Sequence, residues 1–245
     1  MAVPTSSMAP RVVRVWHAHV DDVFDGPGRL ARAVARLRPA EQARYARFRH
    51  DVDRRMFLLG RVMARAAVGD ALGLDPHDWP WREGERGRPE VDLPDCSITF
   101  NLAHSGGVVV CALADCGLVG VDVEARERVK LERALVARCC GPEEAADVET
   151  HGDQWRDRFL QYWTLKESYL KAVGLGISVP LDEVCFRIDG EPRSCFRGSL
   201  AGADAGWAFD LTTLGSTHYL AVAVSPVGGT RPQFVRLPFP TEWMP

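Results

Sequence analysis

The residues best suited to chemistry alternate with valines in a short acidic run at residues 120–124 (GVDVE). In a β-strand successive side chains point to opposite faces, so Asp122 and Glu124 would share one face. Carboxylate oxygens held close together are ligands that Mg²⁺ accepts, and acidic residues are poor strand formers. The run therefore has two interpretations, a magnesium site or an amphipathic strand with a solvated face.

A second set of such residues lies on the helix predicted over residues 155–173. Glu167 and Lys171 are four positions apart and are therefore neighbours on the helix surface. An exposed Glu–Lys pair is the ordinary interpretation, and it contributes only about a few tenths of a kcal/mol. The alternative makes Glu167 a metal ligand or general base, and lets Lys166 and Lys171 neutralise phosphate charge. Two of the three lysines in the chain lie here.

A third candidate is the segment at residues 100–107 (FNLAHSGG), where a predicted strand enters a polar turn. Its glycines permit positive φ and close approach of the backbone. His104, Ser105 and the neighbouring N–H groups would bind a phosphate in such a turn. A tight hairpin with its polar residues in solvent is the alternative. Upstream, residues 87–89 (GRP) are typical of a charged surface turn.

The net charge of −3 conceals a basic segment from Arg29 to Arg65, in which eleven arginines face three acidic residues. This segment is either a solvated helix face or a site for a polyanion such as a phosphorylated cofactor. The acidic chain as a whole argues against a dedicated nucleic-acid-binding protein. No apolar run approaches the roughly 20 residues of a membrane span. Seven irregularly spaced cysteines and the lack of a secretory signal favour a cytoplasmic protein with reduced thiols.

The hydrophobic patterns predict helices first and short strands afterwards in both halves of the chain, which indicates an α+β fold. The predicted helices cover residues 30–72, with breaks near residues 39 and 50–53, and residues 131–138, 142–148 and 155–173. The predicted strands cover residues 11–18, 97–102, 108–114, 118–124, 184–188, 195–200, 207–213 and 219–225. Residues 75–95 are rich in turn residues, and the chain after Pro226 is expected to lie extended on the surface.

Four segments, in this order, resemble the motifs of the phosphopantetheinyl transferases of the surfactin-synthetase-activating (Sfp) type. The family patterns are G-[KR]-P, F-N-[IL]-[SA]-H-S, G-[IV]-D-[IV]-E and W-x-x-K-E-[AS]-x-x-K. The chain carries them at residues 87–89, 100–105, 120–124 and 163–171. The resemblance spans most of the chain, from about residue 39 to residue 225.

The resemblance implies a pseudo-two-fold monomer of two similar α+β halves, each with helices packed on a small, mainly antiparallel sheet. Coenzyme A and Mg²⁺ would bind in the cleft between the halves. The N-terminal half would comprise residues 1–117 and the C-terminal half residues 118–226. The remaining residues, 227–245, would form the proline-rich extended tail.

The resemblance also assigns roles to residues, position by position. The metal ligands would be Asp122, Glu124 and Glu167, and the catalytic residues would be Glu167 and Lys171. The residues that bind coenzyme A would be Arg44, Arg88, His104, Lys166 and Lys171. Residues 39–48 are similar to a basic stretch that grips the 3′-phosphate of coenzyme A in the family, with Arg44 on one of its basic positions. Glu41 stands where many relatives carry lysine, so Arg47, Arg54 or Arg55 would have to supply the missing charge.

The activity implied by the resemblance is a Mg²⁺-dependent transfer of 4′-phosphopantetheine from coenzyme A to a serine of an apo carrier protein. The acceptors would be carrier domains of polyketide, nonribosomal-peptide or fatty-acid synthases, and the length of the chain favours the first two. The residue chemistry by itself leaves two alternatives open. One is a metal-dependent hydrolase of phosphate esters, and the other is a non-catalytic module that binds coenzyme A or carrier proteins.

Overall fold

The computed structural model describes residues 11–26, 28–84, 88–115, 117–127, 131–176, 179–225 and 231–245. Gly87, the first residue of the GRP motif, lies outside these ranges, as do residues 227–230 of the predicted tail. Within the described ranges, no helix combines the length and the apolar character needed to cross a membrane.

The first half of the molecule places its helices before a strand hairpin, as the sequence predicts, and adds a short helix α1 that was not predicted. Its elements are β1 (Val12–His19), α1 (Val20–Val23), α2 (Arg29–Ala35), α3 (Pro39–Arg47), α4 (Asp51–Leu72), β2 (Trp81–Glu83), β3 (Pro89–Val91), β4 (Thr99–Ser105) and β5 (Val108–Ala114). Proline opens α3, where its missing N–H costs no hydrogen bond. The strands β2 and β3 pair with each other inside the segment that the sequence indicated only as turns.

The second half repeats this arrangement. Its elements are β6 (Leu118–Ala125), α5 (Ala134–Cys139), α6 (Pro142–Thr150), η2 (Gly152–Gln154), α7 (Trp155–Val173), β7 (Phe186–Arg187), β8 (Arg193–Ser194), η4 (Gly198–Leu200), β9 (Ala208–Leu214) and β10 (His218–Ser225). The strand predicted at residues 195–200 is wrong, because its second part is the 3₁₀ turn η4. Proline again opens the helix before the long one, α6.

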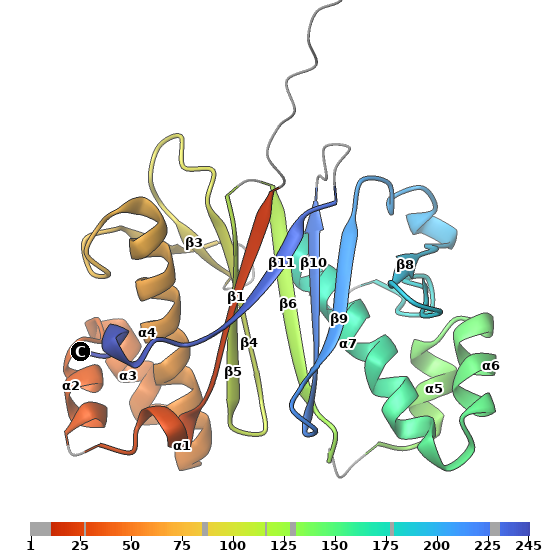
Figure 1. The fold of residues 1–245 in the computed structure, drawn as a ribbon, viewed down its shortest axis with the longest axis horizontal. Coiled ribbons are helices and arrows are strands. Elements are labelled where there is room, and N and C mark those ends of the chain that lie inside the picture. Colours follow the sequence, from red (N-terminus) through yellow and green to blue (C-terminus); the bar gives the residue numbers. More distant parts are fainter. Residues whose placement is uncertain are drawn as a thin grey trace, which may run out of the picture.

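The two sheets have the same internal strand order. In the first half β5 lies between β1 and β4, and in the second half β10 lies between β6 and β9. In each case the first strand of the half pairs with its last strand, and all these pairings are antiparallel. Helices α1–α4 lie on one flank of the molecule and α5–α7 on the other, with the strands between them (Figure 1). The fold is therefore α+β with two similar halves, which confirms the predicted fold class.

The halves meet where β4 lies beside β6. A buried cluster of small apolar side chains from both sheets fills this junction, including Val15, Ala103, Val121 and Val222. The Val121 N–H donates a hydrogen bond across it to Oδ1 of the buried Asn101, at 3.0 Å. The junction is thus a continuous core with a polar cross-link, so the elements on its two sides hold a fixed relation to each other.

The tight hairpin between β4 and β5 follows from its two glycines. Gly106 and Gly107 have φ values of 54° and 86°. Both values are positive, as a two-residue hairpin turn whose twist matches that of its strands requires. The turn fixes the end of β4, and with it His104 and Ser105.

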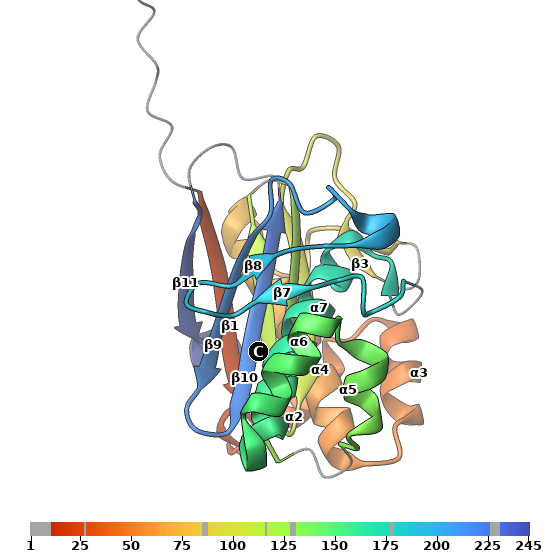
Figure 2. The same cartoon turned by 90° about the vertical axis from the view of Figure 1, so that its right-hand side faces the viewer.

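The C-terminal segment is built into the first half. Residues Gln233–Pro238 form β11, which pairs in parallel with β1 at the edge of the first sheet. Figure 2 shows the two strands side by side. The chain continues through η5 (Thr241–Trp243), where the Trp243 ring packs on Trp16 with 5.6 Å between centroids. The segment is extended, as expected, but as a strand of the sheet.

Candidate active site

Strand β6 lies in unusually close contact with helix α7. A Cβ atom on Gly120 would overlap the carbonyl oxygen of Ser168 and the backbone nitrogen of Ala172. Glycine at this position therefore lets the strand approach the helix backbone. Because side chains alternate along β6, the valines enter the core between the sheets, whereas Asp122 and Glu124 face α7.

Asp122 is a buried carboxylate, 5% exposed. Its Oδ1 accepts a hydrogen bond from the Nζ of Lys171 at 2.6 Å. Its Oδ2 is buried and has no hydrogen-bond partner among the described residues. Burial, together with the smaller effects of the nearby Glu124 and Glu167 charges, raises the pKa of Asp122 to about 7 against the opposing effect of Lys171. Asp122 therefore offers one free, poorly solvated oxygen in an acidic neighbourhood.

Glu124 is held by groups from both halves. Its Oε1 accepts a hydrogen bond from the indole Nε1 of Trp163 on α7 at 2.9 Å. Its Oε2 accepts one from the hydroxyl of Ser105, at the end of β4, at 3.3 Å. Ser105 Oγ in turn accepts the N–H of Ala125 at 3.1 Å. Trp163 and Ser105 thus fix the orientation of this carboxylate, as outer partners of a metal ligand do.

The three predicted metal ligands share one electrostatic neighbourhood but do not enclose a common point. No group of three or more His, Cys, Asp or Glu side chains in the described ranges is arranged to hold a metal ion. The chemistry of the donors nevertheless fits Mg²⁺, because all three are carboxylates and Asp122 Oδ2 is buried without a hydrogen-bond partner among the described residues. The Mg²⁺ site therefore stays a prediction, and the carboxylates of these residues are chemically suited to it.

A cavity of about 330 Å³ opens beside these carboxylates, between α3 and α4 of the first half and α7 of the second. Five residues that the sequence selected line it, namely Arg44, Arg88, His104, Glu167 and Lys171. It is also lined by Met56, Phe57, Gly60, Arg61, Pro89, Asn101, Leu102, Ala103, Val109, Leu170, Gly174 and Gly176. A cavity with several cations on an otherwise largely apolar wall suits a ligand that carries several negative charges.

His104 lines this cavity together with two cations, Lys171 and Arg44. Partial loss of water in the hollow lowers its pKa first, and the charges of Lys171 and Arg44 lower it further, against an opposing effect of Asp53. A neutral imidazole therefore lies within the electrostatic reach of both cations.

Two family models match the chain in tandem. The model for the N-terminal part of 4′-phosphopantetheinyl transferases matches residues 27–116, and the model for the 4′-phosphopantetheinyl transferase superfamily matches residues 118–223. A phosphopantetheinyl transferase of Thraustochytrium sp. is 32% identical over 228 residues, covering 88% of this chain and 79% of that protein. A 4′-phosphopantetheinyl transferase of Bacillus subtilis is 34% identical over 178 residues, covering 72% of this chain and 77% of that protein.

The chain belongs to the 4′-phosphopantetheinyl transferase superfamily. It is an enzyme of this kind, and the resemblance drawn from its four motifs is confirmed. The border between the two matched segments falls between residues 116 and 118, where the chain passes from β5 to β6.

Lys166 of this transferase does not lie where the sequence placed it. Its side chain is 1% exposed and does not line the cavity. Its ammonium group donates to Glu144 Oε2 at 2.6 Å and to the carbonyl oxygens of Leu181 and Val184 at 2.9 and 2.6 Å. These bonds use all three of its protons. The predicted role in cofactor binding is therefore corrected to a structural one in the core of the second half.

Arg88 lines the cavity but directs its donors into the protein. Its Nη1 donates to the carbonyl oxygens of Lys171 and Ala172 at 2.8 and 2.6 Å, and its Nη2 donates to that of Val119 at 3.0 Å. The guanidinium thus caps carbonyl groups of the last turn of α7 and ties that turn to β6. Arg88 anchors the first half of the transferase to the helix that carries Lys171.

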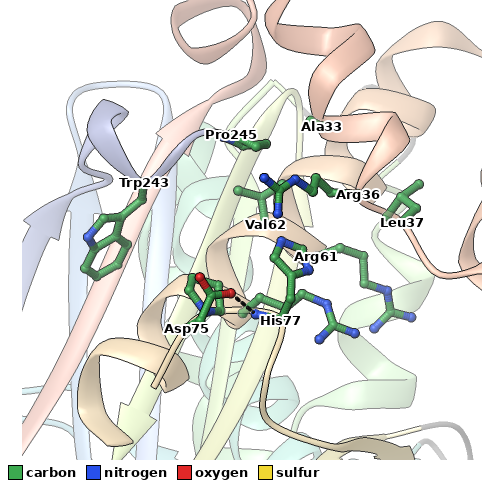
Figure 3. Close-up of a pocket in the computed structure, with 11 residues that line it drawn as sticks. Ala33, Arg36, Leu37, Arg61, Val62, Asp75, His77, Trp243 and Pro245 are labelled. Atoms are coloured by element: carbon green, nitrogen blue, oxygen red, sulfur yellow. Dashed lines mark hydrogen bonds between the residues drawn. The ribbon is translucent and has the colours of Figure 1, made fainter. Parts of the chain in front are cut away.

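Sequence reasoning missed Asn101, Trp163 and Arg61 as parts of the site. Asn101 and Trp163 lie inside the quoted motifs, so their identity was visible but their contacts were not. Arg61 is one of eleven arginines in the basic segment, and no motif singles it out. It also lines a second cavity, of about 160 Å³, between α2, α4 and the C-terminal residues. Figure 3 shows Arg61 there with Arg36, His77 and Trp243.

Proposed function

We propose that this transferase moves the 4′-phosphopantetheine group of coenzyme A to a serine hydroxyl of an apo carrier protein and releases adenosine 3′,5′-bisphosphate. The observation that carries the proposal is the cavity at the junction of the halves. Arg44, His104, Glu167 and Lys171 are among the residues that line it, and Lys171 contacts Asp122 of β6. Such a set of charges supports the binding and activation of a diphosphate.

In the proposed reaction the serine oxygen attacks the β-phosphorus of coenzyme A. A bond forms between that oxygen and the phosphorus, and the bond from the phosphorus to the bridging oxygen of the diphosphate breaks. The serine proton passes to Glu167, which lines the cavity and serves as general base. The nucleotide leaves with the negative charge of the broken bond, so the catalytic demand is for positioning and charge neutralisation.

Lys171 and His104 are the residues proposed to receive the diphosphate. The Lys171 ammonium is 2.6 Å from Asp122 Oδ1, and its side chain is 30% exposed. It therefore keeps donors available to a ligand while its stem is held by the protein. Arg44 and Arg88 are proposed to contact the rest of the cofactor from the first half.

Asp122, Glu124 and Glu167 are proposed to hold Mg²⁺. A bound Mg²⁺ ion would neutralise charge on the diphosphate. The protein contributes the orientation of its ligands, since Trp163 and Ser105 fix Glu124 and Lys171 fixes Asp122. We further propose a cytoplasmic monomer that serves carrier domains of polyketide, nonribosomal-peptide or fatty-acid synthases, without nucleic-acid or membrane partners.

The test is incubation with coenzyme A, Mg²⁺ and a panel of apo carrier domains, followed by mass spectrometry. A modified carrier gains roughly 340 Da, the mass of the transferred group. Glu167→Gln is expected to abolish most of the gain. Asp189→Asn, which changes an exposed carboxylate paired with Arg193, is the matched control and should leave it unchanged.

The two alternative functions give different results in the same assay. Release of nucleotide from coenzyme A without any acceptor would indicate a hydrolase. Binding of coenzyme A with no mass gain on any carrier, while a known transferase modifies the same panel, would indicate a binding module. Either result contradicts the proposed transfer.

A further inference from the structure

Coenzyme A carries two separate phosphate groups, a diphosphate and a phosphate monoester on the ribose, and cations from two sides line the cavity, Lys171 from α7 and arginines from α3 and α4. The bond that breaks belongs to the diphosphate, which the proposed function places beside Glu167 and Lys171 of α7. The monoester is then left for the side of the cavity that α3 and α4 form.

Two arginines on that side contact one aromatic ring. The guanidinium carbons of Arg44 and Arg61 lie 5.3 and 5.0 Å from the centre of the same Phe57 ring, and both side chains line the cavity. We infer that Arg61 joins Arg44, which the resemblance already assigns to this group, in binding the 3′-phosphate of coenzyme A, an inference that rests on the proposed function.

Arg61 is held ready for this contact by aromatic rings. Its guanidinium also lies 4.5 Å from the centre of the Trp81 ring, and its side chain is only 9% exposed. A guanidinium held against aromatic rings keeps its planar N–H fork, which suits phosphate oxygens. Little side-chain entropy remains to be lost when the phosphate binds.

The charges around Arg61 leave room for an anion. Oε1 of Glu41 lies 3.5 Å from Nε of Arg61 and 3.7 Å from Nη2 of Arg65, so one carboxylate oxygen serves two buried guanidinium groups. Glu83 adds a more distant contact at 3.9 Å. Among the described residues, Nε of Arg61 is buried without a hydrogen-bond partner. The same is true of both terminal nitrogens of Arg65, which does not itself line this cavity. Buried charge that is incompletely paired is costly, and a phosphate would supply the balance.

Glu41 acquires a different role from the one its position suggested. Its side chain does not line the cavity, and its Oε2 accepts the Arg38 N–H at the start of α3 at 3.0 Å. The acidic residue is therefore a support for the arginines behind the cavity wall. The positive charge expected at residue 41 is supplied to the cavity instead by Arg61 on the next helix.

The other arginines considered as replacements are engaged elsewhere or lie away from the cavity. Arg54 donates to the carbonyl oxygen of Phe48 at 3.0 Å. Arg55 pairs with Asp51 at 2.7 Å and with Asp21 at 3.3 Å. Arg47 is exposed and does not line the cavity. Only Arg61, among the described arginines of α4, lies on the cavity wall beside Arg44.

The experiment measures binding of coenzyme A and of 3′-dephospho-coenzyme A to the full chain by calorimetry. The wild type should prefer coenzyme A. Arg61→Gln should weaken coenzyme A binding about tenfold or more, as expected for loss of charge-assisted hydrogen bonds. It should change binding of the dephospho compound by less than about twofold. Arg47→Gln, the matched control, should change neither affinity.

Equal losses for both ligands, or no loss for either, would overturn the inference. If Arg61→Gln does not fold, Arg61→Lys decides, because it keeps the charge but not the planar fork. It should retain the fold and lose part of the preference for coenzyme A, and an unchanged preference would overturn the inference. A wild type that neither binds coenzyme A nor modifies carriers would contradict the proposed function instead. A wild type that does both, with no selective loss in Arg61→Gln, contradicts only the role of Arg61.

Discussion

The two halves of the molecule place a glutamate at the same point and use it differently. Glu41 in α3 and Glu144 in α6 each stand two residues after the proline that opens the helix. Each accepts the backbone N–H of the residue before that proline, at 3.0 and 2.8 Å. Each also reaches cations on the long helix that follows. In both halves, therefore, a glutamate at the start of one helix pairs with buried cations of the long helix, and the strand order is also the same.

The two glutamate–cation clusters differ in how completely their charges are paired. In the second half Glu144 and Lys166 are both 1% exposed, 2.6 Å apart, and surrounded by backbone partners. In the first half Glu41 is shared by Arg61 and Arg65 at 3.5 and 3.7 Å. The Glu144–Lys166 pair has no donor left for a ligand, so its role is structural. The incompletely paired arginines at Glu41 lie beside a cavity and keep positive charge available for a ligand. The comparison separates a structural cation, Lys166, from a ligand-binding one, Arg61.

The largest effect is expected from removing the cation of the buried Glu144–Lys166 pair. Lys166→Met leaves the Glu144 carboxylate buried without its cation, and it should lower the free energy of unfolding by about 3–5 kcal/mol. Urea denaturation followed by circular dichroism measures the loss. Arg156→Met, at an exposed arginine on the same helix, is the control and should cost much less. A small loss in Lys166→Met would contradict the structural role.

The next effect concerns activity without loss of the fold. Asp122→Asn removes a charge from the acidic neighbourhood on β6, and kcat/KM should fall on the order of 10²–10³-fold, as for loss of one preorganised charge-stabilising group. The free energy of unfolding should be unchanged or higher, because burial already raises the pKa of this carboxyl. Carrier modification rates and urea denaturation measure the two quantities. Activity at wild-type level would exclude Asp122 from the metal site.

A third prediction compares glycines on the two sides of the molecule. Gly120→Ala on β6 would force a Cβ into the backbone of α7 and should cost about 1–3 kcal/mol or more in the free energy of unfolding. Gly60→Ala on α4 is the matched control, since its Cβ would meet Leu102 and Val109 at an ordinary 3.8 Å. In a helix it should be neutral, or stabilising by up to about 1 kcal/mol. Equal losses would show that the close approach is not specific to the second half.

The smallest effect is expected at Glu41, which is incompletely paired with its two arginines. Glu41→Gln keeps an oxygen for the Arg38 N–H and loses only long contacts to two arginines. Because both arginines are buried, it should cost about 1–3 kcal/mol, against about 3–5 kcal/mol for Glu144→Gln. Binding of coenzyme A should not weaken, because the removed charge is negative. A loss of unfolding free energy equal to that of Glu144→Gln would show that the two glutamates contribute equally to stability.

The sequence by itself determined the fold class and the family. Strong periodic signals gave α4, α7 and the strands that carry motifs, because long amphipathic segments and alternating valines leave few choices. The alternation in residues 120–124 was enough to place Asp122 and Glu124 on one face, and the structure directs that face to α7. The short strands β2, β3 and β8 were not predicted, since strands of two or three residues depend on pairing partners that the local sequence does not specify.

Only the tertiary structure decided what each charged residue does. Lys166 and Lys171 lie in one motif on one helix, yet five positions rotate them to different faces. One lysine is closed into the core by Glu144, and the other meets Asp122 beside the cavity. Likewise Glu41 and Arg61 belong to different helices, and their contact exists only because α3 packs on α4. A motif fixes residue types, but the charge that a ligand meets depends on which neighbours have already paired with it.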